Sequence, residues 1–220
     1  MNRFLMSMVG PGLLILCSQA LAQTALFRDI NYGAPVSDFT AEQGYYDCSD
    51  QGGGQMLCID EISFVGEPFG LALRINDDMV TSVVAVTDLS ETAYSKVFGA
   101  LSENFTFIAM EDKRSLFDLL ERVRAADSEA QFSDELLKFE SFALNEGLLT
   151  YYFVEMPSEQ VQSHRSALSV LRSMPTDKRQ ADLMLREDDS GAYLLVTFTL
   201  PAKDAERLQV NMEKAKKEKF

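Results

Sequence analysis

The chain has 220 residues, with 34 acidic and 20 basic side chains, a formal net charge of -14, three cysteines, one histidine and no tryptophan. A composition that is 46% hydrophobic and 25% charged is typical of a chain that buries a core and folds. The acidity excludes nucleic acid as a partner, because phosphate contacts need a surplus of Lys and Arg. The single histidine, His164, excludes metal or catalytic sites built from several imidazoles.

Residues 1–22 have the features of a cleaved signal peptide. Arg3 supplies the positive start, an apolar stretch follows, and Ala20-Leu21-Ala22 supplies the small residues that precede a cleavage site after Ala22. The apolar stretch is shorter than the roughly 20 residues of a membrane span. We therefore expect a periplasmic or secreted protein with no membrane span, in which 34 acids and 19 bases remain after cleavage.

Two cysteines, Cys48 and Cys58, remain once the leader and Cys17 are removed. In an oxidising compartment such a pair forms a disulfide, and the spacing differs from the C-x-x-C of redox enzymes. Glycines 52–54 separate two β-prone stretches, so a hairpin centred on them would place Cys48 directly opposite Cys58. The predicted disulfide should stabilise the fold by about 2 to 3 kcal/mol.

Apolar periodicity, turn residues and helix caps predict the other elements. After an irregular entry segment at 23–44, we expect strands at 45–49, 56–64, 69–75, 80–87, 105–110, 148–155, 181–187 and 192–200. We expect helices at 90–104, 115–126, 133–145, 157–172 and 201–217.

Hairpins that alternate with helices predict an α+β fold, with a largely antiparallel sheet and helices packed on one face. Residues 23–220 should form a single compact domain or two packed halves at about 45–126 and 132–217. Both halves contain a strand, an acidic turn, a strand and a helix, with turns at Asn76-Asp77-Asp78 and Asp188-Asp189. This weak internal repeat indicates either a duplication or the general similarity of hairpin-helix units.

The sequence lacks the local motifs of serine hydrolases, P-loop proteins, dinucleotide-binding domains and zinc proteases. We expect His164 on the solvated side of a helix. Four acids, Asp47, Asp50, Asp60 and Glu61, surround the cysteine hairpin without the spacing of a calcium loop. The sequence therefore predicts no catalytic, cofactor-binding or metal-binding residue, and no cofactor.

The leading hypothesis is a non-enzymatic binding or inhibitor protein for a basic envelope or secreted partner, because the acidity favours encounter with a partner of opposite charge. The candidate contact loop contains Tyr45, Tyr46, Gly52, Gly53 and Gly54, since tyrosine is favoured in interfaces; packing of the tyrosines in the sheet is the alternative. Other hypotheses are a hydrolase or metal-assisted enzyme that uses loop carboxylates, and an envelope scaffold or assembly factor with an exposed apolar patch or free sheet edge. The sequence does not fix the oligomeric state.

Overall fold

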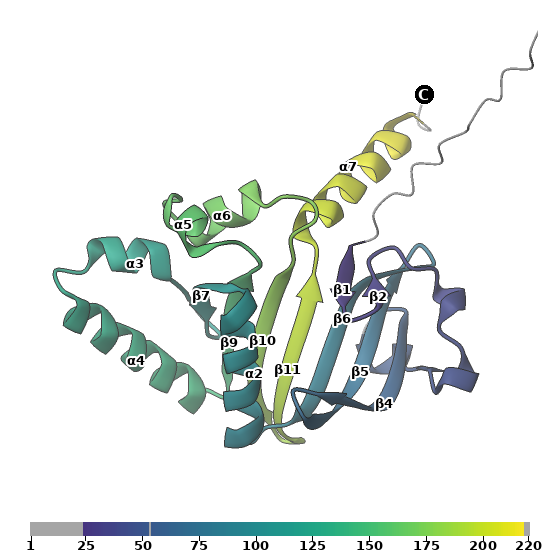
Figure 1. Ribbon diagram of the computed structural model, residues 1–220, viewed down its shortest axis with the longest axis horizontal. Coiled ribbons are helices and arrows are strands. Elements are labelled where there is room, and N and C mark those ends of the chain that lie inside the picture. The colour runs from purple at the N-terminus through teal and green to yellow at the C-terminus, as the bar shows by residue number, and fades with distance from the viewer. Residues whose placement is uncertain (1–23, 53, 218–220) are drawn as a thin grey trace, which may run out of the picture.

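One nine-stranded antiparallel sheet forms the framework of the protein in our computed structural model, which describes residues 24–52 and 54–217 (Figure 1). The strand order is β3-β4-β5-β6-β11-β10-β9-β7-β8. The predicted α+β class with an antiparallel sheet is confirmed. The predicted signal peptide lies outside the described residues.

The strands of the sheet have the following bounds: β3 (Tyr46–Asp47), β4 (Met56–Phe64), β5 (Glu67–Asn76), β6 (Met79–Asp88), β7 (Thr106–Glu111), β8 (Leu116–Asp118), β9 (Leu148–Val154), β10 (Gln180–Asp188) and β11 (Gly191–Thr199). A separate two-stranded pair consists of β1 (Ala25–Phe27) and β2 (Ile30–Asn31). The helices are α1 (Ser49–Gly52), α2 (Glu91–Asn104), α3 (Leu119–Ala125), α4 (Glu129–Asn145), α5 (Ser158–Gln162), α6 (Ala167–Ser173) and α7 (Pro201–Lys217), with 3-10 turns at Val36–Asp38 and Ala41–Gln43.

The main core lies on the sheet face that α2, α4 and the β1–β2 pair cover (Figure 1). Alternate residues of β9, β10 and β11 point into it, among them Phe153, Leu183 and Val196, which are all fully buried. From α2, Phe98 packs edge-on against Phe153, with ring centroids 5.5 Å apart. The period-two pattern of the sequence therefore sets which side of each strand is buried.

A smaller core lies on the opposite face, at the β7 and β9 end of the sheet. Val154 follows Phe153 in β9 and so points to the other side, where it packs with Val161 of α5 and Val170 of α6. The predicted position of all helices on one face of the sheet is wrong for α5 and α6, which lie on the second face. They cover only one end of it, and the middle strands stay half exposed on this side.

Two predicted helices have wrong bounds, because a polar side chain inside each predicted range caps the start of a helix at that point. The predicted helix at 115–126 begins as strand β8, and α3 starts only after Asp118, whose carboxylate accepts hydrogen bonds from the N–H groups of Leu120 and Glu121 at 3.0 and 3.2 Å. The predicted helix at 157–172 is broken into α5 and α6, because Ser166 caps a new helix in a capping box with Ser169.

Two other elements extend beyond their predicted bounds. Helix α4 starts at Glu129 rather than near residue 133, with Ser128 as its cap. The entry segment, expected to be irregular, contains the β1–β2 pair.

The two hairpins with acidic turns are neighbours at the centre of the sheet. Strand β6 of the β5–β6 hairpin pairs antiparallel with β11 of the β10–β11 hairpin, so both halves of the chain contribute to one sheet. The helices that follow the hairpins differ: α2 packs on the core, whereas α7 extends away from the body (Figure 1).

Candidate binding surface

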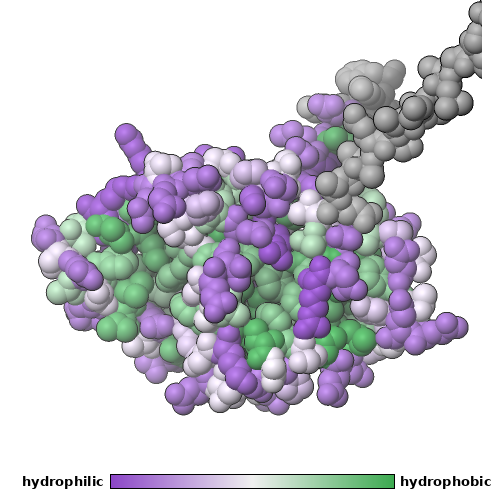
Figure 2. All heavy atoms as spheres, in the orientation of Figure 1, coloured by the Kyte–Doolittle hydropathy of each residue, from purple (hydrophilic) through white to green (hydrophobic). Residues whose placement is uncertain are grey.

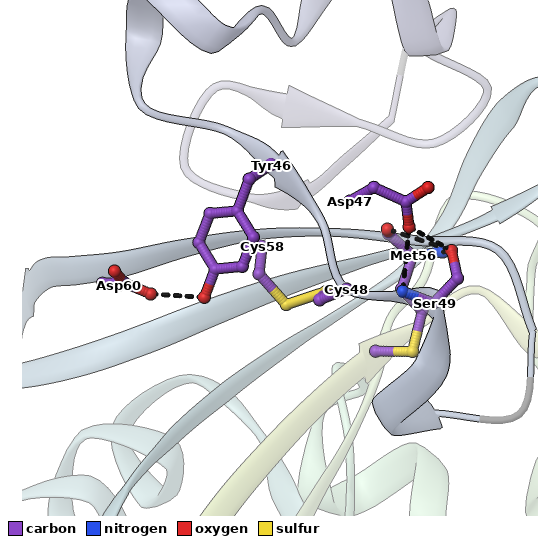
Figure 3. Close-up of a disulfide and its surroundings, with 7 residues drawn as sticks. All are labelled: Tyr46, Asp47, Cys48, Ser49, Met56, Cys58 and Asp60. Carbon is purple, nitrogen blue, oxygen red and sulfur yellow. Dashed lines mark hydrogen bonds between the residues drawn. A yellow bond between two sulfur atoms is a disulfide. The ribbon is translucent and has the colours of Figure 1, made fainter.

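The predicted disulfide joins Cys48 and Cys58, whose Cα atoms lie 5.9 Å apart (Figure 3). Cys48 is almost fully buried and packs with Met56, Ala72 and Val84. The disulfide thus attaches the short edge strand β3 to the sheet and supports a small apolar cluster.

The predicted register of the cysteine hairpin is wrong. Tyr46, not Cys48, lies opposite Cys58, so the disulfide joins diagonal positions. The reason is local: the Asp47 carboxylate accepts a hydrogen bond from the Ser49 N–H at 2.9 Å, and the Ser49 hydroxyl accepts one from the Met56 N–H at 3.0 Å (Figure 3). These side chains close the loop with the helical turn α1 and shift the pairing by two residues.

The structure separates the residues of the predicted contact loop. Tyr45 is half-buried and packs edge-on against Phe39, with ring centroids 5.2 Å apart. Tyr46 is 43% exposed, and its hydroxyl donates to Asp60, a bond that raises the pKa of Tyr46 above its ordinary value (Figure 3). Of the glycines, Gly52 ends α1 and Gly54 is exposed, while Gly53 lies outside the described residues.

Tyr46 is the first residue of a cross-strand row that crosses most of the sheet on its second face. The pairing register fixes the order of the row, which is Tyr46, Cys58, Ala72, Val84, Thr197, Asp182 and Tyr152. A parallel row beside it contains Gly70, Val86, Leu195, Met184, Thr150 and Glu111. Such rows place side chains within contact distance of one another on one surface.

The middle of these two rows is accessible to solvent. Along β10 and β11, core-facing residues are buried and the alternate residues are half-exposed. We call the accessible middle part the open sheet face; its residues are Val84, Val86, Asp182, Met184, Leu195 and Thr197. In Figure 1 it is turned away from the viewer, behind the sheet that α2 covers. Its side chains are mostly apolar, unlike the polar outer face of an ordinary antiparallel sheet.

The charged side chains of the two rows are both acidic. They are Asp182 and Glu111, and Asp60 adds a third carboxylate beside Tyr46. The arginines at the borders are Arg186, which pairs with Asp188 at 2.8 Å, and Arg74. The open sheet face therefore combines apolar area with negative charge.

Asp182 lies within this surface, where its surroundings disfavour the ionised carboxylate. Burial raises its pKa to about 6, the negative charge of Glu111 adds to the rise, and a hydrogen bond from the Gln180 amide at 2.7 Å acts against it. The neighbouring Tyr152 hydroxyl donates to Glu111 rather than to Asp182. No cation pairs with Asp182 among the described salt bridges.

One cleft elsewhere on the molecule is less suited to a basic partner. A cleft of about 530 Å³ between α3 and α4 contains Arg114 and Arg122, which lie over the rings of Phe142 and Phe117 at 5.6 and 5.3 Å. Figure 2 shows apolar surface between these two helices. Arg122 also pairs with Glu135 at 3.7 Å, so this carboxylate of the cleft already has a cation beside it and offers less to a basic partner than the carboxylate of the open sheet face does.

Another cleft, of about 440 Å³, contains a hydrogen-bonded group of polar side chains. The Tyr94 hydroxyl donates to that of Tyr151 at 3.1 Å, and Tyr151 donates to Glu140. Burial is the main cause that raises the pKa of Tyr151, so this phenol stays neutral and acts as a hydrogen-bond donor. The arrangement fixes α2 and α4 on β9.

The remaining polar candidates are dispersed. His164 lies in the break between α5 and α6, not on a helix as predicted, where its Nε2 is 3.2 Å from the Ser173 hydroxyl. Within residues 24–52 and 54–217, no three acidic, histidine or cysteine side chains are grouped to hold a metal ion. No helix of this part of the chain is long and apolar enough to cross a membrane.

Comparisons of the chain with protein families, with curated proteins and with solved structures gave no match. Sequence reasoning missed Asp182 and the apolar surface around it. One signal in the sequence indicated this surface: Val83, Val84 and Val86 make both sides of β6 apolar, which indicates a second face that needs cover.

Proposed function

We propose that this protein is an exported, non-enzymatic binding or inhibitor protein that docks a basic partner on the open sheet face. One observation carries the proposal: the central strands keep a half-exposed apolar surface whose one charged residue, Asp182, is acidic. The signal-peptide features of residues 1–22 and the disulfide, which fits an oxidising compartment, support the export.

The surface supplies both parts of a protein interface. Val86, Leu195 and Met184 are neighbours in one cross-strand row and offer apolar anchors. Asp182, in the adjacent row, would pair with a Lys or Arg side chain of the partner. Pairing would remove the cost of an unpaired, desolvated carboxylate, so a basic partner is favoured over a neutral one.

Tyr46 is the member of the predicted contact loop that remains available for binding. It lies in the same row as Asp182, across the disulfide, and it is exposed. We propose that it contacts the partner at the margin of the surface, because its ring offers a rigid apolar contact. Tyr45 is half-buried against Phe39, so we propose no contact role for it.

A photo-crosslinking amino acid at position 195 tests the proposal, with the same group at Ser133, which is exposed on α4, as the matched control. The partner crosslinked in the envelope from position 195, but not from 133, is then purified and titrated. We expect a basic protein whose affinity falls about tenfold or more with Met184→Lys and falls with added salt. Capture of an acidic protein other than a second copy of this chain, or equal affinity for the Met184→Lys variant, would refute the proposal.

A further inference from the structure

Helix α7 projects from the body and is held by its first two turns, up to Arg207, whose side chain is 20% exposed (Figure 1). The Tyr32 hydroxyl donates to Asp204 at 2.7 Å, and the Lys203 ammonium donates to the Thr24 hydroxyl at 3.0 Å. Beyond Arg207, every side chain described in α7 is exposed. The helix therefore extends about 15 Å past its last anchored turn, at 1.5 Å per residue.

The exposed part of α7 has the chemistry opposite to that of the open sheet face. Leu208 and Met212, spaced by four residues, lie on one side of the helix and are 59% and 57% exposed. Val210 is also half exposed. The α7 sequence contains five basic and three acidic residues in an otherwise strongly acidic chain. It thus combines apolar side chains with net positive charge.

We propose that α7 of one copy docks on the open sheet face of a second copy of this chain. The inference shares its surface with the proposed function, and charge complementarity selects the occupant. Within the part of the chain that the structure describes, an acidic apolar face and a basic apolar helix both lack a cover. Because the first turn of α7 is fixed against Tyr32 and Thr24, the helix points away from its own sheet, and the contact is between copies.

The two surfaces match in size. A helix is about 10 to 12 Å wide, and the three strands β6, β11 and β10 span about 10 Å between their outer backbones. Strands β10 and β11 have nine residues each, about 30 Å, so the free part of α7 fits along them. If each copy inserts its α7 into the other, the contact is made twice and the dimer closes.

The docked helix would occupy the surface that receives the basic partner. Self-association then competes with partner binding, and α7 acts as an internal substitute for the partner. Free partner at a concentration above its dissociation constant would separate the copies.

Analytical ultracentrifugation of the purified protein, over a range of concentration and salt, tests the inference with two variants. Leu208→Gln/Met212→Gln removes the apolar side of α7 and keeps a good helix former, while Met184→Lys adds a positive charge to the face. We expect a dimer for the wild type that weakens with salt, and a monomer for each variant. When the two variants are mixed, we expect a heterodimer, because one intact α7 meets one intact face.

A wild type that stays monomeric at the highest concentration, or a dimer that persists in either variant, overturns the inference. Binding of α7 to anionic lipid vesicles by a protein that stays monomeric overturns it as well. A separate result tests the proposed function. The Leu208→Gln/Met212→Gln variant keeps its open sheet face, so it must still bind the basic partner captured from position 195, whether or not the protein forms a dimer.

Discussion

The replacement Asp182→Asn should stabilise the protein at neutral pH. The folded state raises the pKa of Asp182 to about 6, whereas an unfolded aspartate titrates near 3.9. Two pKa units correspond to about 3 kcal/mol, and the partial exposure of the side chain reduces this to about 2 kcal/mol. An asparagine has no charge to desolvate, and its carbonyl oxygen can still accept the hydrogen bond from Gln180.

The pH dependence has a definite sign. Below about pH 3 the carboxyl group is protonated in both states, so Asp182 imposes no penalty and the variant and wild type should be equally stable. As pH rises from about 3 to about 6, the unfolded state loses its proton first, and the folded wild type becomes less stable relative to the variant. The difference should be complete near pH 7.

Urea unfolding of both proteins at pH 4, 5, 6 and 7 measures this difference, because the acids that do not interact with Asp182 titrate alike in the two proteins and cancel. Asp189→Asn, at the exposed β10–β11 turn, is the matched control and should change stability by less than about 0.5 kcal/mol. If Asp182→Asn is no more stable than wild type at pH 7, or if its advantage is the same at pH 4, the desolvation argument fails.

Three other replacements test the framework of the fold. Changing both disulfide cysteines to alanine should cost about 2.7 kcal/mol by the loop-entropy relation for a separation of 10 residues, and a reductant should then no longer shift the urea midpoint. Gly147→Ala should cost about 2 kcal/mol, because φ is +75° and the new Cβ would lie 2.9 Å from a backbone oxygen; Gly33→Ala, with φ +79° and open space, should cost less. Arg179→Met should cost about 2 kcal/mol at pH 7, since it removes hydrogen bonds of 3.0 and 2.8 Å to Glu155. Burial acts to raise the pKa of Glu155, but the hydrogen bonds and charge of Arg179 outweigh burial and lower it. The greater stability of the wild type should therefore disappear as the pH falls through this lowered pKa. Equal wild-type and variant midpoints at pH 7 would contradict the Arg179 and Gly147 arguments.

Local patterns predicted the fold well where one face of an element is buried. The alternation of buried and half-exposed residues in β10 and β11 agrees with the sequence analysis. Helix α2 agrees as well, and its Ser90 cap accepts a hydrogen bond from the Ala93 N–H. Errors arose where a polar side chain competes for backbone groups. Asp118 and Ser166 each cap a helix at a residue inside a predicted helix, and several Ser and Asp residues in those segments offered equally good caps.

The candidate surface could be predicted only in part. Tyr46 was identified from its residue type, but the two-residue shift in register, which depends on Asp47 and Ser49, placed it opposite Cys58 and in line with Asp182. That row contains residues from β3, β4, β5, β6, β11, β10 and β9, and its order follows from strand pairing over long separations. Sequence periodicity shows which residues share a face of one strand, but not which strands become neighbours.

Asp182 should affect folding and binding with opposite dependence on pH, and this opposition separates a functional role from a structural one. Protonation below about pH 6 relieves the desolvated carboxylate and stabilises the folded monomer. The same protonation removes the charge that would pair with a cation, so docking of the basic partner, or of α7 from a second copy, should weaken from pH 7 to pH 5. The monomer's unfolding free energy and the partner's dissociation constant, measured at both pH values for wild type and Asp182→Asn, decide between the roles. A carboxylate with a structural role alone would alter the first quantity and leave the second unchanged.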